Sequence, residues 1–251
     1  MTLARRLGSL WCIVNSMNPE LQLVQTADGS NTIYNEVVGE NYHSRNGALQ
    51  ESRHVFVNAG LNYFLAENNA SEVSILEVGF GTGLNFLLSA DVCVEREIKL
   101  AYTGIEAYPL SAALINQTGY DQYVSPQLWQ QFINNYEILL NSDPDSYQDC
   151  QLPTGNCKLK IAHCKLLQFQ SEQQYDIIYF DAFAAARQPE MWNEEAITHT
   201  IKFLKPGGVF VTYAITGNLK RMLKALGLTI QKIPGAAGKR EMLRGVVNVQ
   251  M

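Results

Sequence analysis

Short runs of apolar residues alternate with longer segments of helical periodicity from residue 73 onward. Apolar runs of strand length, each followed by a turn or a change of period, cover residues 73–78, 100–106, 158–162, 175–180 and 208–214. Strands that alternate with helices are typical of proteins in which helices cover a mainly parallel sheet. The pattern therefore predicts an α/β fold.

The C-terminal part of the pattern predicts a reversed strand. A helix near residues 218–226 is followed by apolar runs near residues 228–233 and 244–250. The connection between these two runs contains Pro234 and two glycines and is too short for a helical crossover, so the two strands should pair antiparallel. We expect a mainly parallel, seven-stranded sheet with an antiparallel C-terminal strand, unlike a plain dinucleotide-binding fold.

The N-terminal part of the chain has a different pattern. Residues 1–16 carry two arginines before a very short, interrupted apolar patch with no cleavage site, so we interpret them as a disordered extension and not as a signal peptide. Residues 17–70 contain a hairpin-turn signal at residues 28–30 and a helix expected near residues 48–65. This region should form a small N-terminal cap, and residues 71–251 the main domain.

The composition is typical of a soluble protein, and the charged residues are unevenly distributed along the chain. The chain has 251 residues, 47% of them hydrophobic and 17% charged, and no apolar stretch reaches the roughly 18 residues that cross a bilayer. The net charge of −5 conceals 9 basic residues and 1 acidic residue after residue 200, against 10 basic and 23 acidic residues before it. A basic end on an acidic body suits docking on a polyanion, and a solvated helix face is an equal alternative.

The five cysteines are an odd number in a chain too large to need disulfides, which predicts free thiols in a reducing compartment and hence a cytoplasmic protein. Cys150, Cys157 and Cys164 are spaced by seven, with His163 beside the last. They lack the paired short spacings that zinc sites require. No metal site is therefore predicted.

Three alternate glycines, Gly79, Gly81 and Gly83, lie between an apolar strand and a helix. Glycine permits tight turns and close approach of a ligand, and open α/β sheets bind ligands at the carboxyl ends of their strands. The dinucleotide fingerprint requires glycine where this chain has Leu84, which disfavours a nicotinamide cofactor. Glu77 can accept a hydrogen bond from an ammonium group or orient the loop, which suits S-adenosylmethionine with its cationic amino-acid end. The alternative is that the loop serves only as a tight turn. The candidate cofactor contacts here are Glu77, Gly79, Phe80, Gly81, Gly83 and Asn85.

Carboxylates end the second and fourth predicted strands. Glu106 is placed to accept hydrogen bonds from two ribose hydroxyls, or else is a surface carboxylate without a role.

Asp181 is the predicted catalytic residue and a further cofactor contact. In methyl transfer the accepting nitrogen must be neutral, yet an amine with a pKa near 10 is only about 0.1% free base at pH 7. A carboxylate that holds the amine and accepts its proton meets this need, whereas the alternative for Asp181 is a turn cap.

The segment after Asp181 and the basic C-terminal residues are the candidate nucleic-acid contacts. Phe183 is expected to stack on a base and Arg187 to hold a phosphate, whereas Trp192 is expected to pack between this loop and the core. The candidate backbone contacts are Lys220, Arg221, Lys239 and Arg240, with Lys224 and Arg244 nearby. The alternative for residues 238–241 is a hairpin tip held by its own ion pair.

These features together resemble the Rossmann-like, class I S-adenosylmethionine-dependent methyltransferases. The resemblance covers about 140 residues, from the strand with Glu77 to residues 204–208, Leu-Lys-Pro-Gly-Gly, which we interpret as a helix end and a turn before a buried strand. Residues 181–192, Asp-Ala-Phe-Ala-Ala-Ala-Arg-Gln-Pro-Glu-Met-Trp, narrow it to the methyltransferase domain of the MnmC family. Further similar strings, which extend the resemblance over about residues 18–245, lie at residues 28–30, 42–44, 47–48, 51–56, 234–235 and 238–242.

This resemblance implies an activity. The family methylates the exocyclic amine of 5-aminomethyl-(2-thio)uridine at the wobble position of certain tRNAs, which gives the 5-methylaminomethyl form. It implies S-adenosyl-L-methionine as the cofactor, the tRNA anticodon stem-loop as the partner, no membrane association, and Asp181 beside both the methyl group and the accepting amine. A stand-alone methyltransferase is expected, with a separate oxidase that supplies the aminomethyl precursor.

One departure from the family pattern and two alternative functions stay open. Cys164 and Lys165 stand where many such enzymes have Gly-Asp near the adenine, so another group should recognise the adenine here. Aminopropyltransferases of the spermidine-synthase type share the fold and a catalytic carboxylate, and they should have an acidic substrate pocket. The second alternative is a non-catalytic, cofactor-sensing RNA-binding module.

Overall fold

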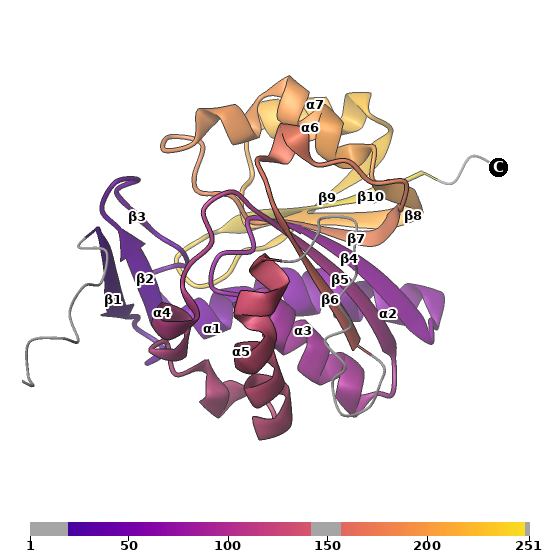
Figure 1. The fold of residues 1–251 in the computed structure, drawn as a ribbon. Coiled ribbons are helices and arrows are strands. Elements are labelled where there is room, and N and C mark those ends of the chain that lie inside the picture. The colour runs from indigo at the N-terminus through magenta and orange to yellow at the C-terminus, as the bar shows by residue number, and fades with distance from the viewer. Residues whose placement is uncertain (1–19, 142–156, 249–251) are drawn as a thin grey trace, which may run out of the picture.

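A seven-stranded sheet forms the centre of the computed structural model, which describes residues 20–141 and 157–248 (Figure 1). Its strands, in the spatial order β6-β5-β4-β7-β8-β10-β9, are β4 (Glu72–Val78), β5 (Lys99–Glu106), β6 (Cys157–His163), β7 (Tyr175–Phe180), β8 (Leu204–Thr212), β9 (Leu228–Pro234) and β10 (Glu241–Val247). β4 to β8 pair in parallel, and β10 is antiparallel to both β8 and β9. The predicted mainly parallel sheet with a reversed C-terminal strand is confirmed.

The strand order reverses at β4. β5 and β6 lie on one side of this strand, and β7 and β8 lie on the other. β4 and β7 are parallel neighbours, and Val78 pairs with Phe180 at their carboxyl ends. Open α/β sheets bind ligands at such a switch point, in the crevice outside the carboxyl ends of the strands. The topology thus places the loop after β4 beside the residues that follow β7.

Helices cover both faces of the sheet (Figure 1). The helical segments after β4 are α3 (Leu84–Glu95), α4 (Ala112–Asn116), η2 (Tyr120–Tyr123), α5 (Pro126–Leu140), η3 (Leu166–Gln168), η4 (Pro189–Trp192), α6 (Glu194–Ile201) and α7 (Gly217–Ala225). Side chains alternate along the strands, so that Ile75 and Ile177 join the core with α3 and α5, and Leu76 and Ile178 join the core with α6 and α7. Burial on both faces explains why the strands read as continuous apolar runs.

Polar residues mark where the helices begin. Asn193 caps α6 by accepting a hydrogen bond from the Ala196 N–H at 2.8 Å, and Thr216 caps α7 by accepting one from the Leu219 N–H at 3.1 Å. The helix predicted near residues 218–226 is therefore confirmed, and it begins at Gly217, the residue after its cap.

The N-terminal region contributes a small sheet and a long helix. β1 (Leu21–Gln25), β2 (Asn31–Asn35) and β3 (Glu40–Asn41) form an antiparallel sheet, with the predicted turn at residues 28–30 between the first two strands. The helix comprises α1 (Ala48–Glu51), the π-helical segment η1 (Ser52–Asn62) and α2 (Tyr63–Asn68). η1 packs against α3, β7 and β8, so this part of the predicted cap region belongs to the core. The division of the chain at residue 70 stays a prediction.

Residues 204–208 do not form the predicted helix end and turn. α6 ends at Ile201, and β8 already begins at Leu204, which pairs with Tyr175. The register then shifts, because the step from Tyr175 to Ile177 in β7 corresponds to the step from Leu204 to Val209 in β8. The Pro-Gly-Gly segment, where Gly207 has a φ of +75°, forms this irregularity within the strand. The strand is therefore continuous where the sequence signals suggested an interruption.

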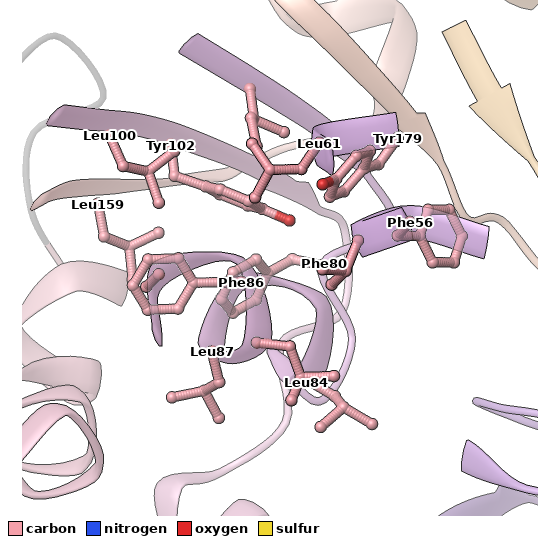
Figure 2. Packing of buried hydrophobic residues seen from close by; sticks show 14 of the residues in the cluster. Phe56, Leu61, Phe80, Leu84, Phe86, Leu87, Leu100, Tyr102, Leu159 and Tyr179 are labelled. Atoms are coloured by element: carbon pink, nitrogen blue, oxygen red, sulfur yellow. The ribbon is translucent and has the colours of Figure 1, made fainter. Parts of the chain in front are cut away.

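An aromatic cluster lies beneath the loop that follows β4 (Figure 2). The ring of Phe86 is 5.1 Å from that of Tyr102 and 5.7 Å from that of Phe132, measured between centroids. Phe80 packs its ring against Gly104, where any β-carbon would collide with it. The Phe80 ring packs against the rings of Phe86 and Phe132, so the cluster anchors the loop to the core.

Several sequence-based expectations concern residues outside the described ranges. These are the extension at residues 1–16 and two cysteines, Cys12 and Cys150. Cys93 and Cys164 are free thiols. Within residues 20–141 and 157–248, no three or more His, Cys, Asp or Glu side chains are arranged to hold a metal ion. None of the helices in these two ranges is long and apolar enough to cross a membrane.

We expect Leu87→Ala to lower the free energy of unfolding by about 2–5 kcal/mol, because Leu87 on α3 is fully buried in this core and its removal leaves a cavity. Leu23→Ala on β1, where the side chain is 42% exposed, is the matched control and should cost about 0.5 kcal/mol or less. Urea unfolding measures both values. Equal losses would show that α3 is not part of the core.

Candidate active site

The glycine loop after β4 is pressed against the end of β7. Gly79 has a φ of +87°, and a β-carbon there would lie 2.5 Å from the carbonyl oxygen of Asp181. The N–H of Asp181 in turn donates to the carbonyl oxygen of Val78 at 2.9 Å. Gly83, with a φ of +76°, is the N-cap of α3 and leaves no room for a β-carbon beside the Phe132 ring. Glycine is therefore required here by conformation and by close backbone approach.

A cleft of about 980 Å³ opens along this loop at the carboxyl ends of β4, β5, β6 and β7. Residues predicted to contact a cofactor line it together, namely Gly79, Phe80, Gly81, Glu106 and Asp181. The ring of Phe80 belongs to the core, so its backbone is the part available to a ligand. Cys164, Lys165 and Gln168 line the part of the cleft after β6. Gly83 is not among the lining residues and acts through the conformation of the loop.

Glu106 holds the glycine loop in place. One carboxylate oxygen accepts the N–H of Gly81 at 2.9 Å, and the other accepts the N–H of Tyr108 at 2.9 Å. Burial raises the pKa of Glu106, and these backbone hydrogen bonds oppose that rise. A carboxylate oxygen can accept more than one hydrogen bond, so Glu106 can also receive hydroxyl groups of a ligand in the cleft.

A buried polar chain connects the core to the cleft. The hydroxyl of Tyr102 donates to Glu77 at 2.8 Å, and the side-chain amide of Asn85 donates to Glu77 at 2.7 Å and to Asp181 at 2.8 Å. Glu77 is fully buried, and burial, followed by the nearby charge of Asp181, raises its pKa. Neither Glu77 nor Asn85 lines the cleft. The structure therefore places both behind Asp181, where they position it, and not at the cofactor surface expected from the sequence.

The carboxyl group of Asp181 binds a proton more readily than an ordinary aspartate does. Its pKa is raised to about 8, first by burial and then by the negative charge of Glu51, while the hydrogen bond from Asn85 and the charge of Lys239 oppose the rise. A carboxyl group that titrates near neutral pH can take up a proton during a reaction and release it afterwards.

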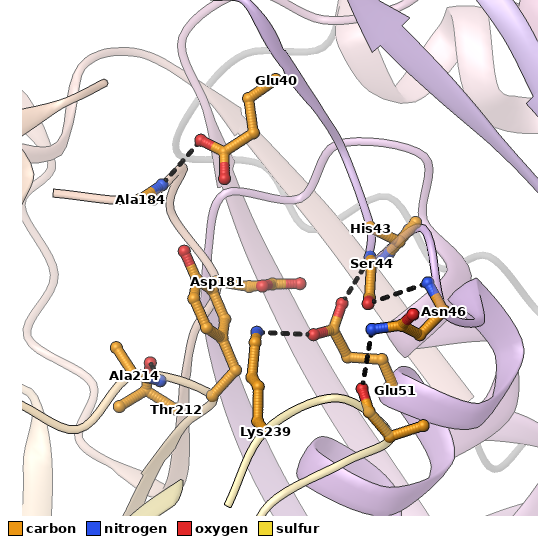
Figure 3. A network of polar contacts seen from close by, with 12 residues as sticks. Glu40, His43, Ser44, Asn46, Glu51, Asp181, Ala184, Thr212, Ala214 and Lys239 are labelled. Carbon is orange, nitrogen blue, oxygen red and sulfur yellow. Dashed lines mark hydrogen bonds and ion pairs between the residues drawn. The ribbon is translucent and has the colours of Figure 1, made fainter. Parts of the chain in front are cut away.

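A second, smaller cavity of about 340 Å³ meets the cleft at Asp181. Figure 3 shows Glu51, Asp181 and Lys239, three of the residues that line it. Both cavities are lined by Tyr42, His43, Asp181, Ala182 and Phe183. The residues that line only the smaller cavity include Glu40, Glu51, Tyr213 and Lys239. This cavity is therefore rich in carboxylates, and Asp181 lies at the junction between two spaces.

The loop after Asp181 forms one wall of this junction. The ring of Phe183 lies 5.1 Å from that of Tyr42, and both rings line the two cavities. Arg187 is exposed at the tip of the loop beside Gly39. Trp192 is buried and donates its indole N–H to the carbonyl oxygen of Phe183 at 2.7 Å. The prediction that Trp192 packs between the loop and the core is confirmed.

The predicted basic contacts fall into two groups. Arg221 and Arg240 are exposed, and Lys220 is partly exposed on α7. Lys239, in contrast, lies in the smaller cavity and forms an ion pair with Glu51 on α1, not within the hairpin tip. Arg244 stacks on the ring of Tyr63 at 3.4 Å and donates to Gln231, so it holds β10 against α2 and β9.

Sequence reasoning assigned no role to His43, Glu51 or Tyr213. His43 is buried and its ring nitrogen lies 2.8 Å from the hydroxyl of Thr82, and burial lowers its pKa to about 4, so that it is neutral. Glu51 and Tyr213 reach the smaller cavity from α1 and from the end of β8. His43 and Glu51 stand in strings that carry the family resemblance, which was the one signal available for them in the sequence.

Comparisons with known proteins agree with this geometry. Residues 122–248 match a protein family described as S-adenosyl-L-methionine-dependent methyltransferase. The tRNA 5-methylaminomethyl-2-thiouridine biosynthesis bifunctional protein MnmC of Pseudomonas savastanoi is 32% identical over 214 residues, which are 81% of this chain and 31% of the relative. The protein of the same name from Magnetococcus marinus is 29% identical over 241 residues, 91% of this chain and 35% of the relative. The chain thus spans about a third of the length of these relatives.

The fold is also similar to a solved structure. MnmC2 from Aquifex aeolicus superposes with a TM-score of 0.70 and 20% sequence identity, over 93% of this chain and 73% of that one. At this identity the likeness supports the fold.

Replacing Asp181 with asparagine should change how stability depends on pH. Because the pKa of Asp181 is about 8 in the folded chain and about 4 in an unfolded one, its proton stabilises the fold below about pH 4, and this contribution is lost as the pH rises to about 8. Asn does not titrate, so the stability of Asp181→Asn relative to the unmodified chain should rise between about pH 4 and pH 8. Urea unfolding across this range measures the difference, with the exposed Asp121→Asn as control. A constant difference would mean that the pKa of Asp181 is ordinary.

Proposed function

The chain belongs to the S-adenosyl-L-methionine-dependent methyltransferases, and from this premise we propose that it methylates the exocyclic primary amine of 5-aminomethyl-(2-thio)uridine at the wobble position of tRNA. The product is the 5-methylaminomethyl form. The observation that carries the proposal is the position of Asp181 at the junction of a cofactor-sized cleft and a second cavity rich in carboxylates. The names of the MnmC relatives, which specify 5-methylaminomethyl-2-thiouridine in tRNA, support the choice of acceptor.

The residues of the larger cleft fit S-adenosyl-L-methionine. The glycine loop forms a cradle that β-carbons would fill, since one at Gly81 would lie 2.9 Å from the ring of Tyr42. We assign the ribose hydroxyls to Glu106 and the adenine to the part of the cleft lined by Cys164, Lys165 and Gln168. When bound, the cofactor supplies an electrophilic methyl group on a sulfonium sulfur.

The chain's own residues prepare the acceptor. A primary amine enters the smaller cavity as an ammonium ion, which the carboxylates there attract. Asp181 accepts a hydrogen bond from this nitrogen, orients it toward the larger cleft and takes up its proton. Asn85 and Glu77 fix the orientation of Asp181 from behind, and the rings of Tyr42 and Phe183 exclude water from the junction.

Recognition of the RNA is assigned to the surface around this junction. The wobble base must turn out of its stack for its amine to reach Asp181, and Phe183 offers an aromatic face for the base. Arg187, Arg221, Lys220 and Arg240 are the proposed phosphate contacts. The proposal includes action on tRNA in the cytoplasm and an oxidase acting on the same uridine, which supplies the primary amine.

The carboxylates of the smaller cavity favour one other candidate, a polyamine as the acceptor. Glu40, Glu51 and Asp181 would attract a polyamine as well as an aminomethyl group. The exposed arginines near the C-terminus favour RNA over a polyamine.

The deciding experiment incubates the protein with methyl-labelled S-adenosyl-L-methionine and tRNA from cells that lack this modification. Label in 5-methylaminomethyluridine after digestion supports the proposal, and no transfer despite bound cofactor supports a non-catalytic RNA-binding module. Incubation with a polyamine and with decarboxylated S-adenosylmethionine that is labelled in its aminopropyl group tests the aminopropyltransferase alternative.

Asp181→Ala should reduce methyl transfer by about 100-fold or more, because it removes the group that orients and deprotonates the amine. The dissociation constant of S-adenosyl-L-methionine, measured by calorimetry, should change by about threefold or less. Asp121→Ala removes an exposed carboxylate from η2 and should leave both quantities unchanged. Full turnover by Asp181→Ala would remove Asp181 from the mechanism.

The affinity for tRNA should fall steeply as salt rises, because phosphate contacts release counterions. Arg221→Gln and Arg240→Gln should each reduce the slope of log K against log salt by about 0.7–0.9. Lys99→Gln, at the far end of β5 from Glu106, is the control and should leave the slope unchanged. Binding that does not respond to salt would contradict this surface assignment.

A further inference from the structure

The ammonium group of Lys239 is fixed on the wall of the smaller cavity (Figure 3). Its Nζ lies 2.9 Å from a carboxylate oxygen of Glu51 and 3.7 Å from the ring centroid of Tyr213. The other oxygen of Glu51 accepts the N–H of Ser44 at 2.7 Å. The Glu51 side chain is only 7% exposed, and that of Lys239 is 35% exposed, so the pair lies largely out of bulk water.

The loop that carries Lys239 is docked onto η1 and onto the turn that precedes α1. The side-chain amide of Asn46 donates to the carbonyl oxygen of Ala237 at 3.1 Å, and a ring nitrogen of His54 lies 2.8 Å from the carbonyl oxygen of Pro234. The N–H of Lys239 donates to the carbonyl oxygen of Ala236 at 2.8 Å. These contacts hold the charge of Lys239 in one place, so it does not need to be organised during a reaction.

The other charged groups at this cavity are mostly acidic. The titratable groups that line it, from every element around it, are Glu40, Tyr42, His43, Arg45, Glu51, Asp181, Tyr213 and Lys239. The guanidinium of Arg45 lies over the ring of Tyr34 at 5.9 Å from its centroid. Negative charge favours the protonated form of an amine, and that form has no lone pair for methyl transfer. The cavity therefore needs a balancing positive charge at the point where the amine reacts.

We propose that Lys239 supplies this charge: held on the Tyr213 ring by Glu51, its ammonium group favours the neutral, nucleophilic form of the primary amine that reacts beside Asp181. This inference rests on the proposed function. The lone pair of the nitrogen forms the new N–C bond as the S–C bond of the donor breaks, and the sulfonium becomes a neutral thioether. The proton released from the nitrogen passes to Asp181 and then to solvent. Lys239 and Glu51 are positioning residues, since they act through the charge near the amine and Asp181.

Charge removal from each partner should have opposite effects. Lys239→Gln removes a positive charge and leaves Glu51 unbalanced, so the pKa of Asp181 and that of the bound amine should both rise. Glu51→Gln keeps an acceptor for Lys239 and removes a negative charge, so both pKa values should fall. We expect shifts of about one pH unit in each direction. Lys239→Arg preserves the charge and should stay close to the unmodified protein, and the double variant Glu51→Gln with Lys239→Gln should lie between the two single variants.

Two measurements separate this inference from the proposed function. The first is a carboxyl ¹³C NMR titration of Asp181 in the protein alone, with the signal identified by its loss in Asp181→Asn. The second is the acid limb of the pH profile of kcat on an anticodon stem-loop that contains 5-aminomethyluridine, since kcat reports groups in the enzyme–substrate complex. Lys99→Gln, which removes a lysine charge at the opposite end of β5, should move neither quantity. Thermal unfolding confirms that each variant is folded.

Opposite shifts of the Asp181 titration and of the acid limb support the inference. The inference is overturned if neither variant shifts the titration of Asp181. It is also overturned if the acid limb stays in place while kcat falls at every pH, because a merely structural ion pair would give that result. If the unmodified protein transfers no methyl group to this RNA, the proposed function fails. The Asp181 titration then still decides whether the Lys239–Glu51 pair controls the charge of the cavity.

Discussion

The close backbone contact between the glycine loop and the end of β7 is the constraint on which the rest of the site depends. β4 and β7 are adjacent at the switch point of the sheet, and the Asp181 N–H donates to the carbonyl oxygen of Val78. The missing β-carbon of Gly79 lets the loop approach to this distance. The same contact shapes the larger cleft and sets Asp181 at its inner edge, so the cleft and the position of this carboxylate have one structural origin.

Electrostatics inside the site oppose stability in favour of function. Two carboxylates, Glu77 and Asp181, lie within hydrogen-bonding reach of the same Asn85 amide, and burial raises the pKa of both. A protein selected for stability alone would place fewer carboxylates here. In the proposed function this arrangement is useful, because a carboxyl group with a pKa near neutral pH can exchange a proton with an amine.

Local signals in the sequence were sufficient for most of the fold. Continuous apolar runs predicted the parallel strands, since strands buried on both faces have no polar side, and the short connection around Pro234 predicted the antiparallel pair β9–β10. The prediction for the Leu-Lys-Pro-Gly-Gly segment was wrong, because residues that favour a turn can also form an irregularity within a strand. Only the pairing of β8 with β7 distinguishes the two. Asp181 could be identified because it directly ends a strand, whereas Glu77 was assigned to the cofactor because its burial behind Asn85 has no local signature.

The sequence by itself determined the order of strands and helices, the glycine loop, and the carboxylates that end β5 and β7, because each depends on the period of apolar residues or on the conformation of a few neighbouring residues. The tertiary structure alone decided what surrounds Asp181. Lys239 and Glu51 are 188 residues apart in the chain, and Asn85 and Asp181 are 96 apart. Contacts over such separations leave no periodic trace in a single sequence, since they depend on how the helix of residues 48–68 and the β9–β10 loop pack around the sheet.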